Sequence, residues 1–414
     1  MTPTPPNRPR VLYLTHRVPF PPDKGDRIRN YHVLRQLAAR AEVWLVALAD
    51  EPVPPETLAA LHKHCARVAV VPVNARRRKL RAGLSALAGR SLTEGAFHEP
   101  AVDAAAAGFL REAHFDAALV SGSGLAPYLR RGGLRQLPGF VDLVDVDSQK
   151  WLDFADAVTG PKRRLYRFEA GRLRKLECEL PGWAAAVSIV SPAEARLYES
   201  FAGAGTATVA TNGVDLDYYA PVPADAPTVP ACAFVGALDY LPNVDAAVSF
   251  AREVWPAVRA KVPAAEFHVI GRKPTPEVVR LGEVPGVVVV GQVPDVRPYV
   301  ARAAVTVVPM RLSRGLQNKV LEAMAMAKPV IAAPPALAAL AAVPGRDLVC
   351  ANTPAEWADA VAGLLSDPAR RRELGANARR FVEDHHHWDR CLRPLLDLVT
   401  GTAVVSPLPS ASAS

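Results

Sequence analysis

The amino-acid sequence predicts an α/β protein of two Rossmann-like domains, each with a doubly wound parallel sheet, that face each other across a cleft. The chain has 414 residues, more than one ordinary hydrophobic core accommodates. Half of its residues are hydrophobic and 22% are charged, which is the profile of a globular protein. Short apolar, β-branched runs alternate with longer amphipathic or alanine-rich segments, and this alternation occurs twice.

In the first half, five short runs predict strands, at residues 11–15, 43–48, 68–73, 117–120 and 140–144. Segments 27–39 and 55–64 between them have the pattern of helices. In the second half, strands are predicted at residues 231–235, 266–270, 287–290, 305–308 and 330–333. The intervening helices are predicted at 244–260, 275–281 and 318–327.

Turn and linker residues separate the two sets of strands. Asn212-Gly213 and the proline-rich passage that follows, up to Pro230, predict the hinge. After the last strand comes a mainly helical stretch that opens with Asp367-Pro368, a plausible helix start, and could return to the first domain. We therefore predict a flexible N-terminus (1–9), two domains (10–213 and 214–380), a C-terminal helix (381–401) and a disordered tail (402–414).

The net charge of +8 lies entirely in the first half of the chain. Residues 1–213 hold 29 Lys and Arg against 21 Asp and Glu, whereas residues 214–414 hold 20 of each. This asymmetry indicates an anionic partner for the first half, with solubility as the alternative. We expect no nucleic-acid binding, because no aromatic stacking platform accompanies the charge. The five scattered cysteines and the lack of a secretory or membrane-spanning apolar run predict a cytoplasmic protein.

In parallel sheets, ligands bind beyond the carboxyl ends of the strands, so the loops after strands are the places to search. The loop after the first strand, HRVPFPPDKGDR at residues 16–27, contains Gly25 and leads directly into a helix whose amides can receive a phosphate or a sugar oxygen. It is not a Walker loop, and the chain has no GxGxxG, which argues against a dinucleotide dehydrogenase.

Three loops of the second half converge by the same logic. Gly236 follows one strand and Arg272 another. The third loop, RLSRGLQNKVLEAMA from residue 311, carries the remaining candidates, which are Arg314, Gly315, Asn318, Lys319 and Glu322. A helix start with Lys319 in its first turn suits a diphosphate, and Glu322 can accept hydrogen bonds from ribose hydroxyls. An ordinary surface helix with a lysine and a glutamate is the alternative interpretation.

Several motifs resemble a known family when taken together. LEAMAMAKPVIA, GALDYLPNVDA, the Gly-Arg after a strand and the NGVD linker resemble the retaining glycosyltransferases of family 4, which have the GT-B fold. THRVPFPPDKGDRIRNYHVLRQLA and VDLVDVDSQKW are similar to a narrower group, the sugar transferases associated with bacterial exopolysaccharide and exosortase (PEP-CTERM) systems. The resemblance extends over residues 10–395.

This resemblance implies that a sugar moves from a nucleoside diphosphate sugar with retention, and that neither a metal nor another cofactor is needed. Glu322 matches the second glutamate of the family's E-x7-E motif, which binds ribose, while Arg272 and Lys319 hold the diphosphate and Gly25 approaches the donor from the other domain. The first glutamate of that motif is replaced by Arg314. The sugar is therefore recognised differently, and Arg314 could pair with a carboxylate, as in a uronic acid donor, or with phosphate.

Catalytic candidates come from the first domain. His16 and Asp26 follow the first strand, and Asp145 and Asp147 follow the fifth. His16, Asp145 and Asp147 are the predicted catalytic residues, although each aspartate could equally be a helix cap. Without an obvious nucleophile, cations and helix dipoles would stabilise the departing diphosphate.

Basic segments in the first half suggest peripheral contact with an anionic membrane. Residues 76–81 (RRRKLR) precede an apolar helical stretch, and a second basic series extends from Lys162 to Lys175. A solvated basic face is the alternative. The acceptor is then expected to be lipid-linked or a saccharide, at the inner face of the cytoplasmic membrane if it is lipid-linked. Two other functions stay open: a UDP-sugar 2-epimerase-like enzyme, and an inactive binding subunit that keeps the fold.

Overall fold

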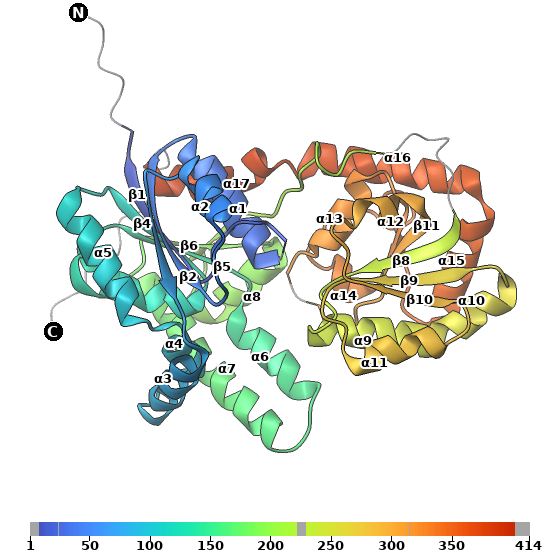
Figure 1. Ribbon diagram of the computed structural model, residues 1–414, viewed down its shortest axis with the longest axis horizontal. Helices are drawn as coiled ribbons and strands as arrows, with labels where there is room; N and C mark the ends of the chain where they lie inside the picture. Colours follow the sequence, from blue (N-terminus) through green and yellow to red (C-terminus); the bar gives the residue numbers. More distant parts are fainter. Residues whose placement is uncertain (1–7, 24, 222–228, 314, 402–414) are drawn as a thin grey trace, which may run out of the picture. The chain divides into compact units, whose positions relative to one another are not determined.

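A computed structural model describes residues 8–23, 25–221, 229–313 and 315–401. The chain divides into two compact units (Figure 1). The first comprises the chain up to Thr211 together with the chain from Leu392 onward, and the second comprises Asn212–Cys391. In the described ranges, no helix is long and apolar enough to cross a bilayer.

The first unit is built on a seven-stranded parallel sheet with the strand order β3-β2-β1-β4-β5-β6-β7. The order reverses between β1 and β4, which creates the switch point where α/β proteins bind ligands. The strands are β1 (Arg10–Thr15), β2 (Glu42–Ala49), β3 (Arg67–Pro72), β4 (Ala117–Ser121), β5 (Gly139–Val144), β6 (Ala186–Ile189) and β7 (Ala207–Val209).

Helices cover the sheet of the first unit (Figure 1). They are α1 (Gly25–Ala38), α2 (Pro55–His62), α3 (Ala75–Leu87), α4 (Leu92–Phe97), α5 (Pro100–Glu112), α6 (Asp147–Asp156), α7 (Pro161–Glu179), α8 (Pro192–Ala202) and most of α17 (Trp388–Val399). Local sequence explains several starts: Asn74 caps α3, Ser91 forms a capping box with Glu94 at α4, and Ser191 caps α8.

A buried ion pair connects α1 to the sheet. Arg29 donates to both carboxylate oxygens of Asp142 on β5, each at 2.7 Å, and the two side chains are 1% and 0% exposed. Ser188 also donates to Asp142, at 2.8 Å. Beside this pair, Tyr13 and Ser121 both donate to the amide oxygen of Asn30. These hydrogen bonds satisfy the ion pair and the Asn30 amide oxygen next to the apolar core, whereas the buried Asn30 amide nitrogen has no hydrogen-bond partner among the described residues.

The second unit repeats the design with six parallel strands in the order β10-β9-β8-β11-β12-β13. They are β8 (Val229–Val235), β9 (Glu266–Ile270), β10 (Val287–Gly291), β11 (Ala303–Val308), β12 (Val330–Ala332) and β13 (Val349–Cys350). The helices are α9 (Leu241–Ser249), α10 (Trp255–Lys261), α11 (Pro276–Val279), α12 (Arg297–Arg302), α13 (Asn318–Ala325), α14 (Pro334–Leu337), α15 (Pro354–Ser366) and α16 (Pro368–His385). A π-helical turn, Phe250–Val254, joins α9 to α10.

The predicted α/β class with two parallel, doubly wound sheets is confirmed. All ten predicted strands are present, and β6, β7 and β13 are additional. The helical stretch predicted to open with Asp367-Pro368 consists of α16 and α17, and the chain from Leu392 onward lies in the first unit.

Candidate functional site

The carboxyl edge of the second sheet brings together loops that are far apart in the sequence. The strand order reverses between β8 and β11, so the loops after these two strands flank the switch point. Gly236 directly follows β8, and Gly271 and Arg272 follow β9. After β11, the chain passes through Gly315, in the left-handed region at φ 59°, and enters α13 at Asn318. Five of the predicted donor-site positions therefore lie at this edge, namely Gly236, Arg272, Gly315, Asn318 and the next residue, Lys319.

Two glycines permit very close packing there. The Gly236 amide donates to the Ile270 carbonyl at 3.0 Å, and the Leu238 amide donates to the Arg272 carbonyl at 2.9 Å. A Cβ atom on Gly271 would lie 1.7 Å from the Gly236 carbonyl oxygen, so a side chain cannot be accommodated without moving the backbone. A Cβ atom on Gly236 would lie 2.9 Å from Lys319 Nζ. Because these two residues have no side chain, the Gly271 backbone can pack against the Gly236 carbonyl, and the Lys319 ammonium can approach the Gly236 backbone.

Lys319, in the first turn of α13, is the central cation of this edge. Its ammonium donates to Asn243 Oδ1 at 2.6 Å and lies 4.6 Å from the centre of the Phe234 ring. Asn243 in turn donates to the Ala237 carbonyl at 2.9 Å, which fixes the amide and hence the lysine. Burial lowers the pKa of Lys319 to about 7, against the opposing charge of Glu322. Asn243 and Phe234 were not predicted as site residues, although Asn243 lies in the GALDYLPNVDA motif and Phe234 lies just before it.

Glu322 lies about one helical turn beyond Lys319. Burial raises the pKa of Glu322 to about 7, while Lys319 and a hydrogen bond with the Tyr219 side chain act in the opposite direction. Burial and the nearby Glu322 carboxylate raise the pKa of Tyr219 far above its ordinary value, so its hydroxyl is the donor. Tyr219 comes from the segment after the NGVD linker and was not predicted. Asn318, the first residue of α13, accepts from the side-chain amide of Asn212 at 3.0 Å.

The predicted donor-site residue Arg314 lies outside the described residues, as does Lys24, which precedes Gly25. Gly25 is the exposed first residue of α1, in the first unit. The resemblance implies that Gly25 contacts the donor, and this role stays a prediction.

His16 lies at the carboxyl edge of the first sheet. One ring nitrogen is 3.2 Å from the Asp26 carboxylate, and the other is 3.3 Å from the Ser121 carbonyl. Arg17 donates to the same carboxylate at 3.0 Å. Although burial acts to raise the pKa of Asp26, the hydrogen bond and charge of His16, together with Arg17, hold it well below its ordinary value. Asp26 therefore stays ionised and orients the imidazole.

Asp145 and Asp147 follow β5 at the same edge. Burial raises the pKa of Asp145 to about 6, with Lys150 acting in the opposite direction. Asp147 accepts a short hydrogen bond from the Ser123 hydroxyl. The amides that open α6 are satisfied by other residues: Val146 N donates to Glu194 at 2.9 Å. Ser148 N donates to Glu177 at 3.0 Å. The helix-cap role left open for the aspartates is thus filled by these buried glutamates.

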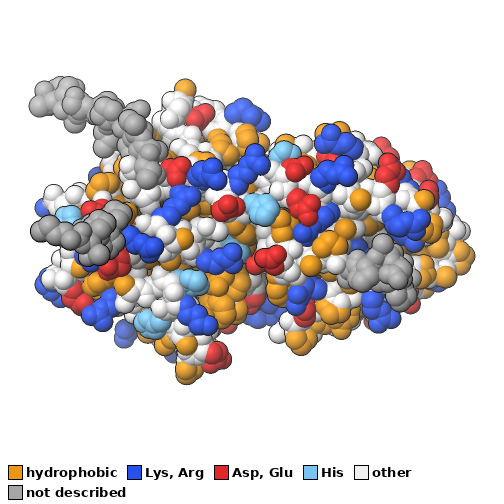
Figure 2. All heavy atoms as spheres, turned by 90° about the horizontal axis from the view of Figure 1, so that it is seen from above, with side chains coloured by type: hydrophobic (Ala, Val, Ile, Leu, Met, Phe, Trp, Pro, Cys, Tyr) orange, Lys and Arg blue, Asp and Glu red, His pale blue; other side chains and the backbone are white. Residues whose placement is uncertain are grey.

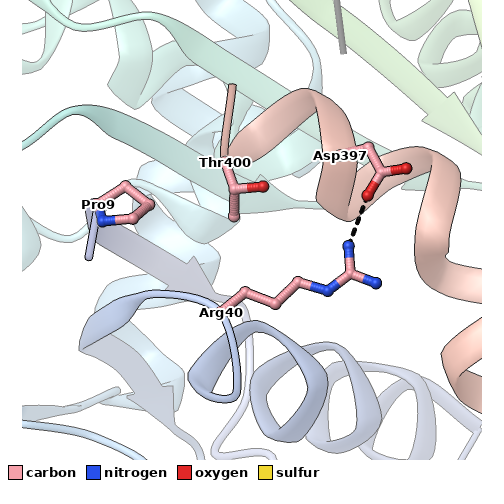
Figure 3. Close-up of a pocket in the computed structure, with 4 residues that line it drawn as sticks. All are labelled: Pro9, Arg40, Asp397 and Thr400. Atoms are coloured by element: carbon pink, nitrogen blue, oxygen red, sulfur yellow. Dashed lines mark hydrogen bonds and ion pairs between the residues drawn. The ribbon is translucent and has the colours of Figure 1, made fainter. Parts of the chain in front are cut away.

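A surface pocket of about 340 Å³ lies elsewhere in the first unit and is lined by Pro9, Arg40, Asp397 and Thr400 (Figure 3). Arg40 reaches across it and donates to Asp397 of α17 at 2.6 Å. None of the predicted site residues lines this pocket. Its main feature is an ion pair that holds α17 in place, so we interpret it as a structural contact.

Known proteins share a domain or the fold with this chain. Residues 229–367 match a family model described as "Glycosyl transferases group 1". This range contains all the predicted donor-site residues of the second unit. A Xenopus tropicalis protein, glycosyltransferase 1 domain-containing protein 1, is 27% identical over 120 residues. That alignment covers 27% of this chain and 32% of the curated relative, so the match spans about a third of the relative's length.

Solved structures share the whole fold. Sucrose-phosphate synthase from Thermosynechococcus elongatus has a TM-score of 0.68 at 19% identity, covering 95% of this chain and 99% of that one. HepE of Anabaena, in complex with UDP, has a TM-score of 0.65 at 16% identity, covering 95% and 100%. WaaG, a glycosyltransferase involved in lipopolysaccharide biosynthesis, has a TM-score of 0.65 at 14% identity, covering 94% and 100%. The group 1 match supports a glycosyltransferase domain at residues 229–367, and the solved neighbours support the GT-B fold.

Proposed function

We propose that the protein transfers a sugar from a nucleoside diphosphate sugar to a lipid-linked or saccharide acceptor. The observation that carries the proposal is the edge of the second sheet, where two glycines, a half-buried lysine and a helix N-terminus adjoin. A helix N-terminus with a lysine in its first turn suits the negatively charged diphosphate. Glu322 supplies an acceptor for ribose hydroxyls. The UDP complex of HepE supports a uridine nucleotide as the first donor to test.

During transfer, the bond between the anomeric carbon and the diphosphate oxygen breaks. The acceptor hydroxyl oxygen bonds to the same carbon and loses its proton. Lys319 and the first amides of α13 stabilise the charge that develops on the departing diphosphate, through electrostatics already in place before the reaction. His16, oriented by Asp26, and Asp145 are the candidates for receiving the proton, with Asp147 held by Ser123 beside them.

The finer features of the proposal rest on the resemblance of the sequence motifs. Family 4 glycosyltransferases retain the anomeric configuration and need no metal, and the opening motif of this chain is similar to the exopolysaccharide transferases of exosortase systems. We therefore propose a retaining reaction in exopolysaccharide biosynthesis, with Arg272 on the diphosphate and Arg314 near the sugar. We also propose that the first unit contacts the membrane surface that carries a lipid-linked acceptor.

A thermal-shift screen tests the donor site directly. The protein is heated with UDP, GDP, ADP or dTDP, and with their sugar conjugates, without added metal. A ligand at about 100 times its Kd stabilises the folded state by about 2.7 kcal/mol, so one nucleotide and its sugar conjugate should both raise the melting temperature. No shift with any nucleotide at millimolar concentration would contradict the proposal. Binding without sugar consumption would favour the inactive binding subunit, and an epimerised nucleotide sugar formed without acceptor would favour the epimerase.

Replacing Glu322 by alanine is expected to weaken nucleotide binding by about 1.5–3 kcal/mol, the value of a lost charged hydrogen bond. Isothermal titration calorimetry of wild type and variant measures this difference. Tyr219→Phe, which removes the present partner of Glu322 but keeps its carboxylate, should bind at least as tightly as wild type. Glu277→Ala on α11, where Glu277 pairs with Arg252 at 3.4 Å, serves as the surface control. Unchanged affinity of Glu322→Ala would remove this residue from the site.

Nucleotide-sugar binding is expected to change from proton release to proton uptake as the pH rises through 7. Below pH 7 Glu322 is largely protonated in the free protein, and ribose hydroxyls favour its carboxylate, so binding releases a proton. Above pH 7 Lys319 is largely neutral, and the diphosphate favours its ammonium, so binding takes up a proton. Calorimetry at pH 6 and 8, in buffers of different ionisation enthalpy, measures both. Lys319→Met should abolish only the proton uptake at pH 8. If wild-type protein released protons at both pH values, or took them up at both, the roles given to Glu322 and Lys319 would be contradicted.

A further inference from the structure

Helix α3 of the first unit presents an unusual outer surface. None of its residues is buried, and Leu80, Leu84 and Leu87 are 64%, 56% and 87% exposed. These are the three highest exposures among the large hydrophobic side chains of the described residues. Spacings of four and three residues place the leucines on one face of the helix. Exposing three leucines in a row along a helix indicates a surface that is covered when the protein works.

The opposite face of α3 fixes the helix firmly to the unit. Arg81 forms an ion pair with Glu99, and the Ser85 hydroxyl donates to the Ser91 carbonyl at 2.8 Å. A Cβ atom on Gly95 of α4 would lie 2.4 Å from both the Arg81 carbonyl oxygen and Ser85 Cβ, so the two helices touch at this glycine. Arg78 lies 4.7 Å from the centre of the Phe97 ring. The leucines are therefore held outward by a well-anchored helix.

Cations surround the leucines. Arg76, Arg77 and Lys79 are exposed, and α3 contains no acidic residue. By helical geometry, Arg77 lies on one side of the leucine stripe, and Arg76 and Lys79 lie on the other. Long basic side chains in such flanking positions can lay their methylenes along an apolar surface while their charges reach outward. We call Leu80, Leu84 and Leu87 with these three cations the leucine face.

We propose that the leucine face docks on the surface of a lipid bilayer that contains anionic lipids, with α3 lying in the plane of the interface. The leucines enter the boundary between headgroups and acyl chains, and the cations meet lipid phosphates. The leucines and the cations of the leucine face then each have a partner in the bilayer. A nucleic acid would leave the leucines exposed, and an apolar protein groove would leave three cations without carboxylates.

A second basic segment lies on the same side of the unit. Helix α7 begins with Lys162, Arg163, Arg164 and the 48% exposed Leu165. Figure 1 shows α3 and the paired helices α6 and α7 projecting from the same side of the first unit. A Cβ atom on Gly89, just beyond α3, would lie 4.0 Å from Arg172 of α7. On the face turned away from α3, seen in Figure 2, basic and acidic side chains are interspersed over the described part of the surface.

The proposal rests on the membrane contact of the first unit proposed above and assigns that contact to the leucine face. Its test uses vesicles without donor or acceptor, so its failure leaves the proposed sugar transfer untouched. The full chain is sedimented with vesicles of phosphatidylglycerol and phosphatidylcholine, or of phosphatidylcholine alone, at low and high salt. We expect the protein to bind the anionic vesicles, and we expect high salt to weaken this binding. Leu80→Ser/Leu84→Ser/Leu87→Ser should reduce the partition coefficient at least tenfold. Arg76→Gln/Arg77→Gln/Lys79→Gln should reduce it on anionic vesicles only.

A matched control carries three serines in place of the exposed valines Val279, Val288 and Val343 of the second unit, and should bind vesicles like wild type. A Leu84→Trp variant adds a second measurement, since brominated acyl chains should quench its additional fluorescence when vesicles bind. No binding by wild type, equal binding by the serine variant, or no quenching at position 84 would overturn the proposal. The proposal would also be overturned if the wild-type protein self-associated, did not bind vesicles, and became monomeric when the three leucines were replaced.

Discussion

Replacing Lys319 by methionine is expected to lower the rate of sugar transfer by about 10²–10³-fold, the usual cost of losing one preorganised group at a site of developing charge. The ammonium of Lys319 donates to Asn243 and lies over the Phe234 ring, so it is already in place before a donor arrives. Methionine keeps the length and the contact with Phe234 but removes the charge. The fold should therefore persist while the departing diphosphate loses its cation.

Steady-state kinetics with the donor found by the nucleotide screen measure this effect, and circular dichroism checks the fold. Lys261→Met is the control, because Lys261 is a surface lysine of the same unit that pairs with Asp359. Asn243→Ala should lower the rate less, since the charge remains but is no longer fixed. If Lys319→Met transferred sugar at the wild-type rate, the leaving group would have to be stabilised elsewhere.

Replacing Arg29 by methionine is expected to destabilise the first unit by about 3–5 kcal/mol. The substitution leaves the Asp142 carboxylate, which is fully buried, with the Ser188 hydroxyl but without its cation. Removing both charges is a different case, because a buried ion pair replaced by apolar groups costs little or nothing. Arg29→Met/Asp142→Leu should therefore recover most of the lost stability.

Denaturant unfolding followed by hydrogen exchange at β1, β4 and β5 measures the first unit separately from the second, which matters because a two-domain chain need not unfold in one step. Arg163→Met is the matched control: its ion pair with Asp156, at 3.5 Å, is largely exposed, and its loss should change stability by less than about 1 kcal/mol. Equal effects of Arg29→Met and Arg163→Met would show that burial of the pair has no energetic consequence.

Most of the sheet architecture could be predicted because its central strands are continuous apolar runs. Strand β11, Ala303–Val308, is buried at every residue and stands out as such in the sequence. The three strands that were not predicted, β6, β7 and β13, lie towards one edge of their sheets and contain four, three and two residues. Runs this short show no periodicity, and only pairing with a neighbour defines them.

The candidate donor site was predictable where it depends on strand ends and not where it depends on tertiary contact. Gly236 and Arg272 follow strands directly, and Lys319 lies in the first turn of the helix after β11, so a general rule of α/β sheets locates them. Tyr219 reaches Glu322 from about a hundred residues earlier in the chain, which no local pattern reveals. The same holds for Glu177 and Glu194, which satisfy the start of α6 from 29 and 48 residues away.

The last helix gives the first unit a composition that is discontinuous in the chain. Leu392, Leu395, Leu396 and Val399 of α17 are almost fully buried, and Asp397 pairs with Arg40. A gene fragment that ends at Thr211 would therefore encode an incomplete domain with an uncovered apolar groove, prone to aggregate. Conversely, a protease that cuts between Thr211 and Asn212 would not free the two fragments, because α17 would still clasp the N-terminal one. The first unit therefore resembles a split protein, because its second segment, α17, comes from the other side of the second unit in the sequence.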